Sequence, residues 1–270
     1  GYAEICDGGI IIMRTGGRVV IINPQEKETS KLQNYSLDKE RSYPVVKANT
    51  LVQKARHQLT AKELKLVDFM VSKVREDDTG FKPIETSIAE INQVMSFGRG
   101  SKNTDETIKA LLALSNKGFW IKIPNAITIS RWLQTAKIDE NGKASLQLDP
   151  QLAPYLLKLV ESKTGHARFS LADVVVLKSK YSIMLYELLM SWRGSMGVNG
   201  HPDEFLEYFG KSDMKWWIFN GKILTPAINE INSKTGIKVH YATRKQGGRT
   251  VEVELDFKGE FSQEQWDQMK

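Results

Sequence analysis

Two stretches in the middle of the chain combine a helix start signal with apolar residues at helical spacing. Thr60-Ala61-Lys62-Glu63 has the pattern of a capping box, and apolar residues follow it from Leu64 to Val71. Ser87 and Glu90 repeat this signal ahead of a second apolar stretch. The pattern therefore predicts two helices, with the turn residues Asp77-Asp78-Thr79-Gly80 between them.

A third helix and a group of strands are predicted next. The spacing favours a helix over Asp105–Lys117 that ends at Gly118. Its expected core face consists of Ile108, Leu111, Leu112 and Leu114. The runs FWIKI and SLQL are expected to be strands, with TAKIDENGKA projecting between them as a wing. Helices followed by such strands are typical of a winged-helix domain.

The same order of elements recurs in the second half of the chain. A strongly apolar helix is expected in YSIMLYELLMSWRG, a short one in FLEYFG, and a third within Lys215–Gly236. Two strands around Gly247-Gly248 then complete the unit. At about 100° per residue, the third helix should turn four apolar residues to the core, namely Trp217, Leu224, Ile228 and Ile231. The expected fold class is α+β, with two tandem winged-helix domains.

Residues 1–43 differ from the rest of the chain. β-Branched residues on both sides of Thr15-Gly16-Gly17 suit a strand pair, and the polar run that follows is typical of a linker. The expected organisation is an N-terminal arm of unassigned role at 1–43, a first winged-helix domain at 44–155, a second at 156–260 and a tail at 261–270.

Positive charge is concentrated in one part of the chain. Between Lys211 and Arg249, eight Lys and Arg residues stand against Asp213 and Glu230, a net charge of +6. The whole chain is also +6, so everything outside this stretch sums to zero. A local basic surface is expected of a nucleic-acid-binding protein, and a solvated charged face is the simpler alternative.

Composition narrows the class of protein further. The 270 residues, 41% hydrophobic and 26% charged, are typical of a soluble globular protein with room for two cores. The single cysteine, Cys6, argues against a disulfide framework or a cysteine-rich zinc site. No apolar run is long enough to span a bilayer, and a secretory signal is missing. We expect a cytoplasmic protein without membrane contact.

Several motifs resemble one family, and they occur in its order. They are Asn49-x-Leu51-Val52, Leu59-Thr60-x-x-Glu63, Tyr181-Ser182-x-x-Leu185-Tyr186-Glu187-Leu188-Leu189, and Phe219-x-x-Lys222-Ile223-Leu224-x-Pro226-Ala227-Ile228-x-Glu230-Ile231-Asn232 followed by Thr235-Gly236. From about Pro44 to Phe257 the chain thus resembles the theta-type plasmid replication initiators, which have two winged-helix domains.

The resemblance implies a function in the bacterial cytoplasm that requires no cofactor. Such proteins bind direct repeats (iterons) in double-stranded origin DNA, usually as monomers, help to open the duplex and recruit host replication proteins. As dimers they commonly repress their own gene at an operator. The third helix of the second domain typically reads the major groove, and the first domain adds DNA and dimer contacts. Family members often carry a basic run where this chain has Asn220-Gly221-Lys222, so its sequence preference is expected to differ.

The candidate DNA contacts follow from side-chain chemistry and position. Lys and Asn can bond to base edges, Thr can touch a thymine methyl, and basic wing residues usually hold phosphates. In the third helix of the second domain the candidates are Lys215, Asn220, Lys222, Thr225, Asn229, Asn232 and Lys234. In its wing they are Arg244, Lys245 and Arg249. In the first domain they are Arg99, Lys102, Asn103, Lys109, Asn116 and Lys117.

Other functions are less well supported by the sequence. FGRGSK lacks the spacing of a phosphate-binding loop, and the four histidines are too scattered to form a metal-binding motif. A tandem winged-helix transcriptional regulator without initiator activity is the second hypothesis. An enzyme whose catalytic residues are dispersed along the sequence is the third.

Overall fold

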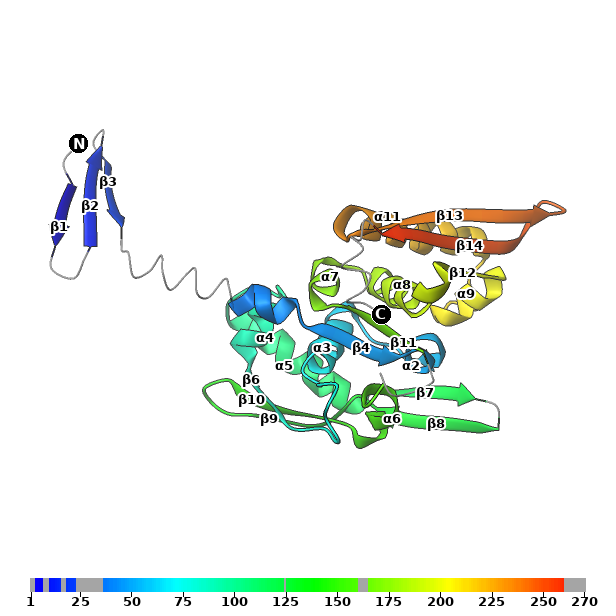
Figure 1. Cartoon of the computed structure of the whole chain (residues 1–270), viewed down its shortest axis with the longest axis horizontal. Coiled ribbons are helices and arrows are strands. Elements are labelled where there is room, and N and C mark those ends of the chain that lie inside the picture. Colours follow the sequence, from blue (N-terminus) through cyan, green and yellow to red (C-terminus); the bar gives the residue numbers. More distant parts are fainter. Residues whose placement is uncertain are drawn as a thin grey trace. The chain divides into compact units, whose positions relative to one another are not determined.

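The computed structural model describes residues 3–6, 10–15, 18–22, 36–123, 125–159 and 165–259. The chain divides into two compact units, Gly1–Ser42 and Tyr43–Lys270 (Figure 1).

The first unit contains a three-stranded antiparallel sheet in the order β1-β2-β3. Its strands are β1 (Ala3–Cys6), β2 (Ile10–Thr15) and β3 (Arg18–Ile22). The pairing of β2 with β3 confirms the expected strand pair, and β1 adds a strand that was not predicted. Of the expected linker, residues 36–41 are helical, and residues 23–35 lie outside the described part of the chain.

The second unit begins with a winged-helix domain in which three helices pack with a three-stranded sheet. The helices are α3 (Ala61–Val71), α4 (Ile88–Val94) and α5 (Ser101–Asn116). The strands are β6 (Ile84–Ser87), β9 (Leu133–Ile138) and β10 (Lys143–Leu148), paired in the order β6-β10-β9.

The helix starts in this domain follow their sequence signals. The Glu63 N–H donates to Thr60 Oγ1 at 3.3 Å, and the Thr60 N–H donates to Glu63 Oε2 at 2.8 Å, so the predicted capping box is complete. Ser87 Oγ accepts the Glu90 N–H at 3.1 Å. Both helices therefore begin where a side chain satisfies a free backbone donor.

The strand assignment predicted for the first domain is correct for SLQL, which lies in β10, but wrong for FWIKI. The FWIKI strand, β7 (Gly118–Ile123), lies outside the winged sheet and pairs with β8 (Ala126–Arg131) and the short β5 (Ala55–Arg56). The wing is the β9–β10 hairpin, which contains the predicted TAKIDENGKA. β7 pairs with β8 because the chain turns back on itself at Asn125. The φ of 68° at Asn125 is of the kind that asparagine tolerates better than most residues.

The predicted limits and core face of α5 also need correction. The helix starts at Ser101 rather than Asp105. Ile108 and Leu112 are 36% and 62% exposed, so they do not belong to the core face. Thr107 is fully buried in their place, and its hydroxyl donates to Asn92 Oδ1 at 2.6 Å, which removes the usual cost of burying a polar group.

A connecting layer links the two winged-helix domains. It contains the antiparallel pair β4 (Pro44–Ala48) and β11 (His166–Ser170), and the helix α2 (Asn49–Lys54). The 3₁₀ turn η1 (Pro150–Leu152), α6 (Ala153–Leu156) and α7 (Leu171–Val176) complete it.

The second domain repeats the topology of the first. Its elements are α8 (Lys180–Ser191), the 3₁₀ turn η2 (Arg193–Ser195), β12 (Gly197–Gly200), α9 (Pro202–Tyr208), α10 (Trp216–Phe219), the π-helical turn η3 (Asn220–Leu224), α11 (Thr225–Lys234), β13 (Ile237–Gln246) and β14 (Arg249–Gly259). The sheet order β12-β14-β13 matches β6-β10-β9 strand for strand. The predicted tandem of winged helices is confirmed.

A buried ion triad joins the two domains. Lys47 Nζ on β4 lies 2.5 Å from Asp68 Oδ1 on α3 and 2.8 Å from Glu187 Oε2 on α8. All three side chains are buried. Burial and the neighbouring Glu187 carboxylate raise the pKa of Asp68. The two domains therefore share a polar core.

Candidate nucleic-acid interface

The third helix of the second domain keeps helical backbone angles through all three of its segments. Phe219, Asn220, Leu224 and Thr225 all have αR dihedral angles. The Thr225 N–H bonds to the Asn220 carbonyl five residues earlier, which defines the π turn. Pro226, which has no N–H, follows directly, so the irregular turn and the proline coincide. α11 thus begins at Thr225 as a continuation of the π turn.

The π turn changes which residues face the core. An extra residue in the turn shifts the phase of the preceding segment by about 100° relative to a regular helix. Leu224, Ile228 and Ile231 are buried as expected, but Trp217 is 70% exposed. The core position expected for Trp217 is therefore wrong, and Phe219 is fully buried instead.

The exposed side of this helix forms one stripe along its length, called here the reading stripe. Its residues are Trp217, Gly221, Lys222, Pro226, Asn229 and Ser233. Lys215, the N-cap residue of α10, is exposed at one end of it. The stripe thus keeps Lys215, Lys222 and Asn229 from the predicted contacts accessible to a ligand.

The other four predicted contacts in this helix have bonds within the protein. The two polar atoms of the Asn232 side chain bond to the backbone of Val239, at 3.0 and 2.6 Å, and so fix the corner between α11 and β13. The half-buried Thr225 donates to Asn220 Oδ1 at 3.2 Å. Lys234 Nζ lies 3.4 Å from Glu230 Oε1. Asn232 thus already uses one amide N–H and its amide oxygen within the protein.

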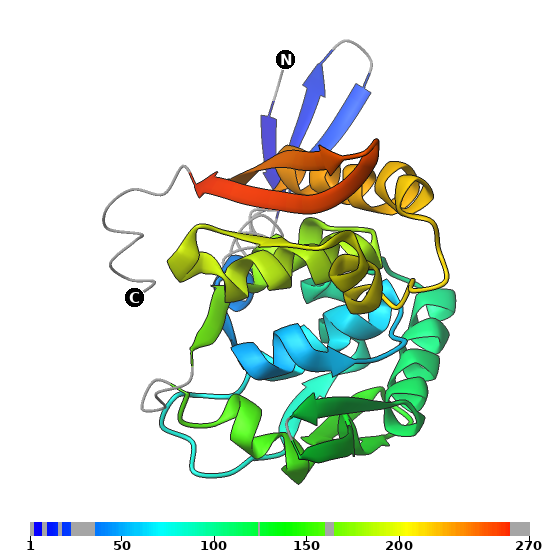
Figure 2. The ribbon, with the colours of Figure 1, turned by 90° about the vertical axis from the view of Figure 1, so that its right-hand side faces the viewer.

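The predicted wing of the second domain is present as the β13–β14 hairpin, drawn in orange and red in Figure 2. Gly247 and Gly248 form its tip with φ of 57° and 77°, a geometry that favours glycine. Lys245 and Arg249 are exposed beside the tip. Arg244 is also exposed, with its Nε 2.7 Å from Glu252 Oε2 across the hairpin.

The first-domain candidates lie along α5 and just beyond its two ends. Arg99, Lys102, Lys109 and Asn116 are exposed. The side chain of Asn103 donates to the Arg99 carbonyl at 2.8 Å, within the first turn. Lys117 Nζ lies 2.8 Å from both Glu63 carboxylate oxygens, and so its charge is partly neutralised.

A groove of about 840 Å³ lies between the C-terminal end of α5 and the loop that leads into α10. Its cationic side chains are Arg56, Lys117, Lys180 and Lys211. His57 also lines it, and burial together with Lys47, Lys180 and Arg56 lowers its pKa to about 4. Glu207 also lines the groove, 3.6 Å from Arg56, so the positive potential there comes chiefly from Lys180 and Lys211.

The groove could not be predicted from the sequence because it is assembled from several separate elements. Arg56 is on β5, Lys180 starts α8, and Lys211 follows α9, so no spacing along the chain connects them. Arg56 is further held by Tyr208, whose ring centroid lies 5.7 Å from the guanidinium carbon. Only the excess of Lys and Arg after Lys211 gave a partial signal.

Within the part of the chain that the structure describes, no group of three or more His, Cys, Asp and Glu residues is arranged to hold a metal ion. No helix there has the length and apolar character needed to cross a membrane.

Comparison with known families gives two matches that together cover most of the second unit. Residues 44–190 match the family described as Initiator Replication protein, WH1. Residues 202–257 match Initiator Rep protein, WH2.

Solved structures with a similar fold agree with this result. The Pi initiator protein in complex with iteron DNA has a TM-score of 0.61 and 13% identity, over 82% of this chain and 99% of that one. Domains 2 and 3 of RctB have a TM-score of 0.50 and 12% identity, over 77% of this chain and 86% of that one. At this level of identity, both establish a shared fold.

Proposed function

The chain belongs to the initiator replication protein family, and from that premise we propose that it binds repeated sites at a plasmid origin and initiates replication there. The observation that carries the proposal is the winged-helix topology shared by the two domains, with a groove lined by Lys117, Lys180 and Lys211 between the end of α5 and the loop before α10. In helix-turn-helix proteins this helix enters the major groove. Two such helices within one compact unit can read two segments of one duplex. The complex of the similar Pi initiator protein with iteron DNA supports this view.

The reading stripe is the proposed source of sequence preference. Lys222 and Asn229 lie on its exposed side, and their amine and amide groups suit guanine and adenine edges respectively. Trp217 and Pro226 give the stripe apolar surface for sugars or thymine methyl groups. Trp217 is thus a proposed addition to the sequence-based set.

The groove and the wing are proposed to hold the phosphate backbone. Lys180 and Lys211 line the groove, and Lys245 and Arg249 lie beside the wing tip. Contacts of this kind fix the register of a protein on the duplex without reading sequence. Lys102 and Lys109 on α5 would do the same for the first domain.

Salt dependence of binding tests the phosphate contacts. Replacing both Lys180 and Lys211 by Ala should lower the slope of log affinity against log salt by about two units, with equal effect on cognate and unrelated DNA. The Lys82→Ala variant is the matched control, because Lys82 lies in the loop between α3 and β6 and pairs with Asp78. A slope unchanged in the double variant would exclude the groove as a backbone site.

Self-association is proposed to use the outer face of the β7–β8 hairpin. Trp120, Ile127 and Ile129 are 44%, 62% and 77% exposed there, and Trp120 and Ile129 are directly paired. β8 is the edge strand of its sheet, so its backbone is accessible to a second copy. Ile129→Lys should shift the monomer–dimer equilibrium toward monomer in sedimentation experiments, and an unchanged equilibrium would exclude this face.

We further propose that repeat-bound copies open the adjacent duplex and recruit host replication proteins, and that dimers repress the gene of the protein itself. Footprinting on the plasmid DNA tests the central claim. Protection of several direct repeats beside an AT-rich segment, and loss of replication on deletion of the gene, are expected. A single protected operator with normal replication would favour a transcriptional regulator instead, and DNA nicking or nucleotide turnover by the purified protein would favour an enzyme.

A further inference from the structure

The α7–α8 connection, residues 175–179, has backbone groups at which one helix ends and the next begins. They are the carbonyls of Val175 and Val176 at the end of α7, and the N–H groups of Lys178 and Ser179 at the start of α8. Helix ends leave such groups without partners inside the helix, so other parts of the protein must satisfy them where water does not. In this structure the partners come from both winged-helix domains.

The first domain supplies the partner of one carbonyl. Lys65 on α3 is buried, and its Nζ donates to the Val175 carbonyl at 2.7 Å. α3 in turn packs against α5, where Lys62 Nζ lies 3.1 Å from Glu106 Oε2. The end of α7 is thus bonded to the helix that supports the third helix of the first domain.

α11 of the second domain supplies the partners of the other three groups. Glu230 Oε1 accepts the Lys178 N–H at 2.8 Å, and Glu230 Oε2 accepts the Ser179 N–H at 3.1 Å. Lys234 Nζ, one turn later, lies 3.4 Å from the Val176 carbonyl. The Glu230 side chain is only 15% exposed. Both of its carboxylate oxygens are therefore bonded to the start of α8.

The bonds of Glu230 constrain α11 in a way that its apolar contacts do not. Ile228 and Ile231 on α11 are buried, but apolar contact is non-directional and tolerates a small rotation of the helix. A hydrogen bond weakens steeply when its distance or angle changes. A carboxylate that accepts two successive N–H groups therefore fixes the rotation of α11 about its axis, and with it the direction of the neighbouring Asn229 on the reading stripe.

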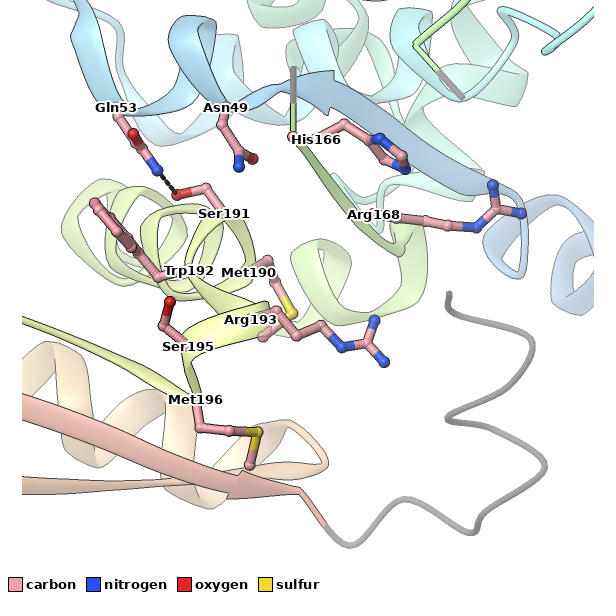
Figure 3. Close-up of a pocket in the computed structure, with 12 residues that line it drawn as sticks. Asn49, Gln53, His166, Arg168, Met190, Ser191, Trp192, Arg193, Ser195 and Met196 are labelled. Carbon is pink, nitrogen blue, oxygen red and sulfur yellow. Dashed lines mark hydrogen bonds between the residues drawn. The ribbon is translucent and has the colours of Figure 1, made fainter. Parts of the chain in front are cut away.

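The other end of α8 is held less closely to the first domain. A cavity of about 710 Å³ separates residues 190–196, at the end of α8 and in the turn after it, from α2 and β11 (Figure 3). Across this cavity Gln53 on α2 donates to Ser191 Oγ at 3.1 Å. The start of α8 is therefore the end at which the first domain, through Lys65, and α11, through Glu230, are bonded to one short connection.

We propose that Glu230 is a positioning residue for the DNA interface. Its carboxylate holds the reading stripe at a set rotation and distance relative to α5, through the α7–α8 connection and Lys65. The protein thereby selects for the spacing between the two DNA segments that its third helices contact. This inference rests on the proposed DNA binding, and it assigns a part of the specificity to a residue that touches no base.

Binding to duplexes of altered spacing tests this role. One base pair inserted between the segments that the two domains protect rotates one segment by about 35° and moves it by about 3.4 Å. Wild type should bind this duplex at least about tenfold more weakly than the cognate repeat, because both segments can no longer be contacted at once. Glu230→Ala should reduce the ratio to about threefold or less, and Glu230→Gln, which keeps one acceptor oxygen, should lie between the two.

The ratio of the two affinities separates positioning from a loss of folded protein. A smaller folded fraction weakens binding to both duplexes alike and leaves the ratio unchanged. The matched control is Ser87→Ala, which removes the oxygen that accepts the Glu90 N–H at the start of α4 and should keep the wild-type ratio. A wild-type ratio in both Glu230 variants would overturn the proposal.

Distances between spin labels test the same role without DNA. In a Cys6→Ser background, labels attached through Asp105→Cys on α5 and Ser233→Cys on α11, both exposed, report how the two helices lie. Glu230→Ala should broaden this distance distribution, but not that of the first-domain pair Asp105→Cys and Gln134→Cys. An unchanged width would overturn the proposal, whereas failure of the wild type to bind any repeat would contradict the proposed function.

Discussion

Lys222 lies exposed on the reading stripe, in the π-helical turn, and is the one basic residue of Asn220-Gly221-Lys222. If its ammonium group bonds to a base edge, Lys222→Ala should weaken binding to the cognate repeat by about 1–3 kcal/mol. Unrelated DNA should lose much less affinity. Gel-shift titrations at constant salt measure both effects.

The control for this substitution must remove a lysine without approaching the DNA. Lys82→Ala meets that requirement and should leave both affinities unchanged. Equal losses of cognate and unrelated affinity in Lys222→Ala would place Lys222 on the phosphate backbone, and no loss would remove it from the interface.

His57 gives a prediction about acid stability. Its ring contacts Trp132 edge-on at 5.7 Å, and burial together with nearby cations lowers its pKa from 6.5 to about 4. Between pH 4 and pH 6.5, His57 is protonated in the unfolded chain but neutral in the folded protein. The stabilising contribution is therefore complete above pH 6.5 and is lost as the pH falls through 4, a loss of up to about 3 kcal/mol.

Urea unfolding across this pH range measures the loss. His57→Gln should flatten the dependence of unfolding free energy on pH, whereas His201→Gln should not, because His201 is exposed. If wild type and His57→Gln lose stability in parallel, the acid sensitivity originates elsewhere.

Among the elements, the starts of the helices could be predicted because the capping residues and the hydrogen bonds that they make lie within one turn of the chain. Thr60 and Glu63 satisfy each other within one turn, so their sequence alone is informative. The orientation of Trp217 could not be predicted from local signals, because it depends on a π turn that precedes Pro226 and shifts the helix phase. β7 could be recognised as a strand, but not assigned to its sheet. That choice is made by pairing with β5, which lies far away in the sequence.

Substitution of Gly221 tests the stability of the third helix of the second domain. This glycine has a helical environment, and a Cβ added to it would meet no atom within 4 Å. Gly221→Ala should therefore raise the unfolding free energy by about 0.5–1 kcal/mol, by reducing the backbone freedom of the unfolded chain. Gly236→Ala is the matched control, because it also has open space but lies beyond α11. A destabilised Gly221→Ala would mean that the π turn requires glycine.

In the whole molecule, the parts of the site that sequence could not predict are those created by domain packing. The reading stripe belongs to a single helix, and its Lys222 and Asn229 were accessible to pattern analysis. The groove brings Lys117 of the first domain beside Lys180 and Lys211 of the second only after the two domains have packed. Its charge thus depends on the relative position of the two domains, which the buried triad helps to set.

The triad makes that dependence testable. Lys47→Met would leave Asp68 and Glu187 buried side by side without their cation, which should cost about 3–5 kcal/mol in urea unfolding. Replacing all three residues by apolar ones should recover much of this stability, since buried ion networks often contribute little net free energy. If the charges also fix the domain arrangement, the triple variant should still bind the cognate repeat more weakly than wild type. Full recovery of both stability and affinity would show that apolar packing alone positions the two third helices on the DNA.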